Sequence, residues 1–326
     1  MSRHHYIQTA QNKVYQKTIP LLKIKRNILA ALAYFDMFDY PLTYGEIFLF
    51  LENKYCQSDF NDAVNCLISS STIFQFDKFY SLKNDPNIAT RRNKGNAKAA
   101  ELINKARDVG RLLIKFPYVR GVGISGSLSK CYADDKSDID LFIITEKNRL
   151  WIARTIMHCF KKLTFLINKQ HHYCMNYYID EQQLQIVEKN IYTAIEIDTL
   201  IPLEGDTVFE QFYAANVWTR GLLPNRTLRL STAKPLRKHL IKSWIESLFN
   251  NRTGNWLDDT LMKITANRWH KKTLMKKLNM RGTVMGMAAS KHCAKPDPVN
   301  FQTRLINRYQ YKLNSLFHET EDKIAQ

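Results

Sequence analysis

The chain has 326 residues, 45% of them hydrophobic, which predicts about two folded domains and argues against a disordered chain. It carries 48 Lys and Arg against 30 Asp and Glu, a formal net charge of +18. This excess favours a polyanionic partner, namely nucleic acid, a phosphorylated substrate or an acidic membrane surface. A generally basic, solvated surface is the alternative.

Cysteine usage and hydropathy predict a cytoplasmic protein without a membrane span. The six cysteines are scattered without C-x-x-C spacing, which is typical of reduced thiols. The N-terminus lacks the apolar core of a signal peptide. No stretch approaches the roughly 18 uninterrupted apolar residues that a transmembrane helix needs.

Residues 1–85 predict three helices followed by a β-hairpin. The first helix ends at Pro41, and Thr43 with Glu46 three residues later forms a capping box that starts the second. A third helix is expected over 61–69.

The hairpin of this N-terminal module is expected to turn at Asp77-Lys78. Three helices and a hairpin are the order of a winged helix, and a small helical cap on a larger domain is the alternative. The third helix carries Asp62 but no Lys or Arg, which favours a packing or protein-contact role over DNA binding.

Residues 86–225 predict a core of strands and helices. A long basic helix is expected over 86–118. Its solvated face would hold Arg91, Arg92, Lys94, Lys98, Lys105 and Arg107. Expected strands end at the Gly126-Ser127 turn, begin at Asp138 and cover 171–179, and helices are expected over 191–203 and 207–225.

Residues 226–326 predict a basic helical region. Its last helix has a stripe of Phe301, Leu305, Tyr309 and Leu313, which we expect in the core. The tryptophans, including Trp151, Trp218 and Trp244, are also expected to be core residues.

The stretch GVGISGSLSKCYADDKSDIDLFIIT, residues 121–145, is typical of a phosphate and metal site. Asp138 and Asp140 lie two apart and share one face of a strand, with Ile139 directed into the core. Two such carboxylates repel one another, and Mg²⁺, which favours carboxylates and substrate phosphates as ligands, relieves that conflict.

The turn before the aspartates offers groups that suit a phosphate. Gly126 allows close backbone approach. Ser127 offers a hydroxyl and an N–H at the start of an expected helix, whose dipole favours an anion, and Lys130 adds a counter-charge. A strand that ends in ordinary surface aspartates is the alternative.

Through GSLS (Gly126 to Ser129) and DID (Asp138 to Asp140), each flanked by an apolar strand, the chain resembles the nucleotidyltransferase superfamily. That superfamily includes DNA polymerase beta, the antibiotic nucleotidyltransferases and the minimal nucleotidyltransferases. The likeness covers about residues 100–205. The segments YFDMFDYPLT, NYYI and LLPN are also similar to bacterial members with an N-terminal winged-helix-like segment.

The resemblance implies an α+β fold: a mixed β-sheet with flanking helices, an N-terminal winged-helix-like module and a C-terminal helical region. It implies an Mg²⁺-dependent transfer of a nucleoside monophosphate from an NTP to a hydroxyl acceptor of unknown identity. Asp138 and Asp140 would be the metal ligands and catalytic residues, and Gly126, Ser127 and Lys130 would bind the phosphates.

The superfamily usually supplies a third carboxylate from a following strand, and here the expected strand offers Asn176, which cannot act as a base. Asp180, Glu188 and Glu196 remain candidates for the third carboxylate. Glu196 is also compatible with a helix-surface or capping role.

The missing strand carboxylate leaves an alternative function open. The chain would then be a weak or inactive nucleotidyltransferase fold that acts as a nucleic-acid or protein-binding module. The breadth of the superfamily adds a third hypothesis, a partner in a toxin–antitoxin pair that modifies a protein or a transfer RNA.

Overall fold

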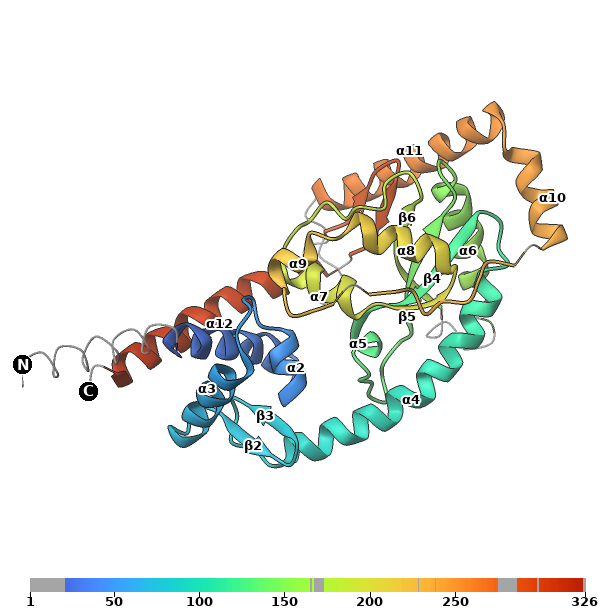
Figure 1. Ribbon diagram of the computed structural model, residues 1–326. Helices are drawn as coiled ribbons and strands as arrows, with labels where there is room; N and C mark the ends of the chain where they lie inside the picture. The colour runs from blue at the N-terminus through green and yellow to red at the C-terminus, as the bar shows by residue number, and fades with distance from the viewer. Residues whose placement is uncertain are drawn as a thin grey trace, which may run out of the picture. The chain divides into compact units, whose positions relative to one another are not determined.

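The structure, a computed structural model, describes residues 21–164, 166, 173–227, 229–237, 239–274, 286–297 and 299–324. It has the α+β fold that the sequence predicts, and the chain divides into two compact units (Figure 1). The first unit combines the N-terminal residues up to Asn93 with Arg220–Thr227 and the C-terminal residues from Leu305. The second comprises Lys94–Thr219 and Leu228–Arg304.

Three helices and a small antiparallel sheet form the N-terminal part of the first unit. Its elements are a helix with described residues 21–36, β1 (Leu42–Thr43), α2 (Tyr44–Leu49), α3 (Gln57–Ser69), β2 (Phe74–Phe76) and β3 (Phe79–Ser81). The strands pair in the order β1-β3-β2, and Asp77 turns the hairpin with a φ of 55°. The predicted hairpin is therefore confirmed.

The predicted capping box at the start of α2 is also confirmed. The Thr43 hydroxyl accepts a bond from the Glu46 N–H at 3.3 Å, and the Glu46 carboxylate accepts one from the Thr43 N–H at 2.7 Å. Both bonds satisfy backbone donors that the first turn of a helix leaves without partners.

One basic residue of the helix α4 (Asn87–Leu113) departs from the predicted solvated face. Arg92 is buried, and its guanidinium lies 3.6 Å from the centre of the Tyr40 ring. It pairs with Glu46 at 2.8 Å and donates to the Pro41 carbonyl. Arg92 thus fixes α4 to the start of α2, which composition alone did not indicate.

A six-stranded mixed sheet organises the second unit. Its strands are β4 (Val119–Ile124), β5 (Asp140–Thr145), β6 (Cys174–Asp180), β7 (Ile201–Glu204), β8 (Ala288–Ala289) and β9 (Cys293–Lys295). Their order is β7-β4-β5-β6-β9-β8, and β5 and β6 form its parallel pair.

Two parts of this sheet were not predicted. The helix expected over 191–203 ends at Thr199, and Ile201–Glu204 instead forms β7, which pairs with β4. The short strands β8 and β9 lie where the sequence predicts a break in the helical pattern, over 280–298, but their pairing was not predicted, and β9 extends the sheet beyond β6. The predicted strand over 171–179 appears as β6, and His171 and His172 lie outside the described residues.

Eight further helices follow α4 in the described part of the chain. They are α5 (Gly126–Ser129), α6 (Leu150–Thr164), α7 (Ile191–Thr199), α8 (Asp206–Ala215), α9 (Thr219–Leu222), α10 (Leu240–Phe249), α11 (Arg252–Leu274) and α12 (Phe301–Ile324). None of the helices in the described part of the chain is long and apolar enough to cross a bilayer.

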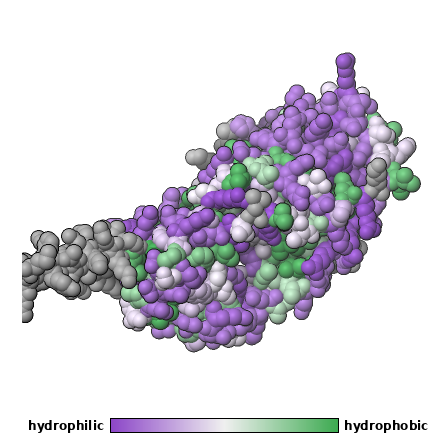
Figure 2. All heavy atoms as spheres, in the orientation of Figure 1, coloured by the Kyte–Doolittle hydropathy of each residue, from purple (hydrophilic) through white to green (hydrophobic). Residues whose placement is uncertain are grey.

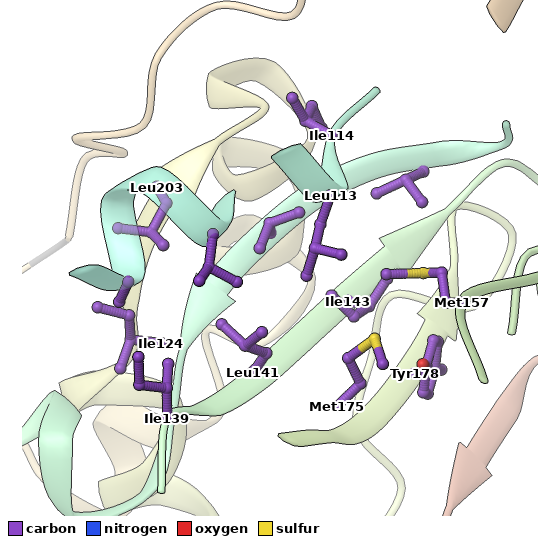
Figure 3. Packing of buried hydrophobic residues seen from close by; sticks show 14 of the residues in the cluster. Leu113, Ile114, Ile124, Ile139, Leu141, Ile143, Met157, Met175, Tyr178 and Leu203 are labelled. Carbon is purple, nitrogen blue, oxygen red and sulfur yellow. The ribbon is translucent and has the colours of Figure 1, made fainter. Parts of the chain in front are cut away.

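Alternating residues of β5 bury both faces of the sheet. Leu141 and Ile143 pack in one cluster with residues of α4 and α6 (Figure 3). Phe142 and Ile144 pack on the opposite face with residues of α7 and α8. Since side chains alternate along a strand, Asp140 belongs to the face that α7 covers.

The predicted core positions are only partly correct. Trp151 is fully buried, and Leu305 and Tyr309 of the α12 stripe are buried as well. Trp244, expected in the core, is instead largely exposed on α10, and Phe301 is also exposed. Helical periodicity identified the apolar stripe of α12 but could not tell which of its residues another element covers.

Candidate functional site

The Gly126-Ser127 turn connects β4 to the one-turn helix α5. Gly126 has a φ of 69°, a left-handed conformation that glycine adopts without steric cost. The Ser129 hydroxyl and the Lys130 ammonium both donate to the Gly126 carbonyl, at 2.8 and 3.0 Å. Ser127 is exposed. The helix expected here is a single turn, so a large helix dipole does not contribute at this turn.

Asp138 and Asp140 lie where β5 begins. Ile139 between them is buried in the sheet core, as the alternation predicted. The Ser125 N–H donates to the Asp140 carbonyl at 2.9 Å, which fixes the turn beside the first residue of β5. The antiparallel pairing of β4 and β5 thus brings the two motifs, about ten residues apart in sequence, to one edge of the sheet.

The glycine turn and the second aspartate are in direct contact. A Cβ atom placed on Gly126 would lie 2.5 Å from Oδ2 of Asp140, closer than two such atoms can approach. The absence of a side chain at Gly126 therefore allows the Asp140 carboxylate to lie against the turn.

Glu196 of α7 contacts the same turn, and Figure 1 shows the segments labelled α5 and α7. Its Oε2 accepts a bond from the Gly126 N–H at 3.2 Å, and its Oε1 pairs with the Lys130 ammonium at 2.7 Å. Glu196 therefore binds two of the groups that the sequence assigned to a phosphate. Of the three candidates for a third carboxylate, it is the one that contacts the turn.

Burial and like charge act together on Asp140. Desolvation raises the pKa of its carboxyl to about 7, and the negative charges of Asp138 and Glu196 add to the increase. Lys161 and Lys130 act in the opposite direction on this pKa. The site thus holds a carboxylate whose charge the surrounding residues do not fully compensate.

Polar residues of β6 and α6 complete the surroundings of the aspartates. The Asn176 side-chain amide donates to Oδ1 of Asp140. The Cys174 sulfur lies 4.0 Å from Oδ2 of Asp138 and 3.4 Å from the Lys161 ammonium. Lys161 was not predicted, because its approach to β5 depends on the packing of α6 and leaves no local sequence signal.

Tyr192, on the first turn of α7, is a second residue that the sequence did not single out. Desolvation raises the pKa of its phenol well above the usual value, and the charges of Glu196, Asp297 and Asp140 contribute. Tyr192 thus lies in the electrostatic field of the same carboxylates.

The other two candidate carboxylates have structural partners elsewhere. Asp180 lies at the opposite end of β6 from Cys174 and is fully buried. It accepts bonds from the Asn148 N–H at 2.9 Å and contacts the His292 ring at 2.8 Å. Glu188 is paired with Lys295 at 3.8 Å.

The two arginines that flank the start of α6 also have structural partners. Arg149 is buried and donates to the Asn255 side chain at 2.6 Å. Arg154 stacks over the Trp269 ring at 4.8 Å. Both therefore stabilise the packing of α6 against α11.

The oxygen donors of this site fit one mode of Mg²⁺ binding. Within the described residues, no cluster of three or more His, Cys, Asp or Glu side chains is arranged to hold a metal ion. Mg²⁺, however, is commonly held by one or two carboxylates together with substrate phosphates. The pair Asp138 and Asp140, with the uncompensated charge on Asp140, fits an ion that arrives with a phosphate ligand.

Comparison with known proteins adds no relative. No family model matches the chain, no curated protein matches it, and no solved structure matches its fold. The function is therefore argued from the site alone.

Proposed function

We propose that the chain is a Mg²⁺-dependent nucleotidyltransferase, which transfers a nucleoside monophosphate from an NTP to a hydroxyl acceptor and releases pyrophosphate. The observation that carries the proposal is the contact between the Gly126 turn and Asp140, with Asp138 beside it. A small-residue turn that offers a backbone N–H and a pair of carboxylates are the two halves of a metal–triphosphate site.

The residues of the turn would hold the phosphates. The Gly126 N–H and the Lys130 ammonium are the donors, and both now contact Glu196. A backbone N–H directs one hydrogen bond, so a phosphate that takes the Gly126 donor displaces the Glu196 carboxylate from it. Ser127 is exposed and free of the core, so its hydroxyl lies at the accessible side of the turn.

Asp138 and Asp140 would hold the ion that accompanies the triphosphate. When bound, Mg²⁺ would neutralise charge on the phosphates and orient the α-phosphate for attack by the acceptor. After its displacement from Gly126, Glu196 would lie on the same side of the sheet as the aspartates, where a carboxylate can accept the acceptor's proton.

Calorimetric titration of Mg²⁺-NTP into the wild-type chain and into the Asp138→Ala, Asp140→Ala double variant tests this assignment. We expect the affinity of the double variant for Mg²⁺-NTP to fall by more than about tenfold, because it loses the carboxylates that would hold the ion on the phosphates. A tenfold change in affinity corresponds to about 1.4 kcal/mol. Unchanged nucleotide affinity in a folded double variant would reject the assignment.

Asp135→Ala is the matched control. Asp135 lies in the loop before the pair, and its side chain is almost fully exposed. Its removal should leave nucleotide affinity unchanged. Cooperative thermal unfolding of all variants separates loss of the site from loss of the fold.

Asn176 favours a second candidate function, a nucleotide- or nucleic-acid-binding module without transfer activity. Its amide occupies the strand position beside Asp140 from which the resemblance leads us to expect a carboxylate, and an amide cannot take a proton. Turnover of labelled NTPs with a panel of hydroxyl acceptors separates the two functions. Binding without turnover, together with strongly salt-dependent RNA or DNA binding, would favour the module.

The N-terminal helices and hairpin fit a winged-helix-like module in this proposal. The order of three helices, a hairpin and a three-stranded sheet supports that assignment. The helix α3 carries Asp59 and Asp62 and no basic residue, which favours a protein contact over DNA binding.

A further inference from the structure

The helix α10 has its charged side chains on its buried face. The Lys242 ammonium is buried and donates to the Ile114 and Val119 carbonyls at 2.8 and 2.5 Å. Glu246, one turn later, accepts from the Tyr118 N–H at 2.6 Å and pairs with Arg120 at 2.8 Å. These contacts fix which side of α10 faces the rest of the second unit, at the start of β4.

The opposite side of α10 is apolar and exposed. We define the α10 face as Leu240, Ile241, Trp244 and Leu248, whose side chains are 89%, 77%, 65% and 48% exposed. Figure 2 shows hydrophobic residues on the surface over the segment that Figure 1 labels α10. An amphipathic helix normally buries its apolar side, so this reversed orientation indicates that the α10 face contacts a partner.

The exposed charged residues that neighbour α10 in the sequence are basic. Between Arg229 and Trp256 the sequence contains one acidic residue, Glu246, and that residue is paired on the buried side. Arg237 precedes the helix and Arg252 follows it, and both are exposed. The face is therefore an apolar stripe with a cation near each end, and an anionic partner complements it.

A second copy of the chain does not suit this surface. A helix of ten residues is only about 15 Å long, and its stripe offers far less than the roughly 1,600 Å² that a stable dimer buries. Antiparallel pairing of two α10 helices would also place Arg237 of one copy beside Arg252 of the other, which brings like charges together.

We propose that the α10 face binds an anionic lipid surface, with α10 lying in the plane of the membrane interface. Aliphatic side chains and a tryptophan would enter the boundary between headgroups and acyl chains, and the flanking arginines would contact anionic headgroups. Trp256, which lies early in α11, is a second exposed tryptophan close to α10 in the sequence. This inference does not depend on the nucleotide site.

Co-sedimentation of the full chain with vesicles tests the proposal. The wild-type chain should sediment with vesicles of phosphatidylcholine and phosphatidylglycerol, and far less with phosphatidylcholine alone. The variant Leu240→Gln, Trp244→Gln should bind the anionic vesicles at least about tenfold more weakly, because two large apolar side chains no longer leave water.

A second variant and a control keep this test independent of folding. Arg237→Glu, Arg252→Glu leaves the apolar stripe intact and should also lose binding to the anionic vesicles. Val187→Gln is the matched control, because Val187 is 71% exposed and lies outside the α10 face. It should bind as the wild type does.

Three outcomes would overturn the proposal. They are failure of the wild-type chain to bind anionic vesicles, equal binding to neutral vesicles, and unchanged binding of both double variants. Light scattering adds a further decisive outcome: a wild-type dimer that Leu240→Gln, Trp244→Gln converts to a monomer would assign the face to a second copy instead.

Discussion

Asp140 is a residue whose charged form is disfavoured by its surroundings in the site. It lies against a glycine turn, is desolvated, and is near the charges of Asp138 and Glu196, which together raise its pKa to about 7. The charges of Asp138 and Glu196 make ionisation of the Asp140 carboxyl less favourable, in addition to its desolvation. Functional sites are where such perturbed groups gather.

The raised pKa makes a prediction about stability and pH. The Asp140 carboxyl binds its proton more tightly in the folded chain, so its contribution favours folding at low pH and is lost as the pH rises from about 4 to about 7. Asp140→Asn has no such charge. Its unfolding temperature should exceed that of the wild type above pH 7, and the difference should vanish near pH 4.

Thermal unfolding followed by circular dichroism across this pH range measures the effect. Asp135→Asn, which changes a nearly fully exposed side chain, is the control and should follow the wild-type profile. Parallel profiles for Asp140→Asn and the wild type would contradict the electrostatic account.

Gly126 provides a second prediction at this scale. Gly126→Ala places a Cβ atom on a residue whose φ is 69°, a left-handed conformation that is strained for alanine. This Cβ atom would lie 2.5 Å from Oδ2 of Asp140. We expect a loss of about 1–2 kcal/mol in the free energy of unfolding from the backbone conformation alone. Displacement of Asp140 should also weaken Mg²⁺-NTP binding.

Gly45→Ala is the matched control, because a Cβ there meets nothing within 4 Å and the residue lies in the helix α2. It should leave stability unchanged or raise it slightly. Equal denaturant midpoints for Gly126→Ala and the wild type would contradict the close contact between the turn and Asp140.

At the scale of elements, the sequence correctly predicted features that depend on hydrogen bonds between residues close together in the chain. The capping box of Thr43 and Glu46 and the hairpin turn at Asp77 were correct, because each depends on bonds within a few residues. The strand Ile201–Glu204 was wrongly predicted as helix, because its pairing with β4 outweighs local helical spacing. Glu196 could not be assigned from sequence, since its partner Lys130 is 66 residues away.

Arg92 allows a prediction for the contact between α4 and α2. Arg92→Met removes the buried partner of Glu46 and the ring contact with Tyr40. We expect the free energy of unfolding to fall by about 2–3 kcal/mol, less than for a fully buried pair, because Glu46 is partly exposed.

Arg91→Met is the control on the neighbouring residue. Arg91 is exposed and pairs with Asp85 at 3.3 Å, so its loss should cost less than about 1 kcal/mol. Urea unfolding measures both values. Equal losses for the two variants would contradict the role assigned to Arg92.

At the scale of the whole molecule, the resemblance implied the α+β class and composition predicted a basic chain, but neither indicated where apolar side chains are exposed. The net charge of +18 suggested a polyanionic partner, and the structure adds an apolar face on α10 that composition could not locate. Trp244 was expected in the core, because a tryptophan on an amphipathic helix is usually covered. Its exposure depends on Lys242 and Glu246, which hold the opposite side of α10 against the residues that precede and begin β4.

The most direct test of the central claim is a crystal structure with Mg²⁺ and a non-hydrolysable NTP. We predict an ion in contact with the carboxylates of Asp138 and Asp140, phosphate oxygens on the Gly126 N–H and the Lys130 ammonium, and a Glu196 side chain turned away from Gly126. A nucleotide bound elsewhere, with both aspartates out of contact with the ion, would contradict the account.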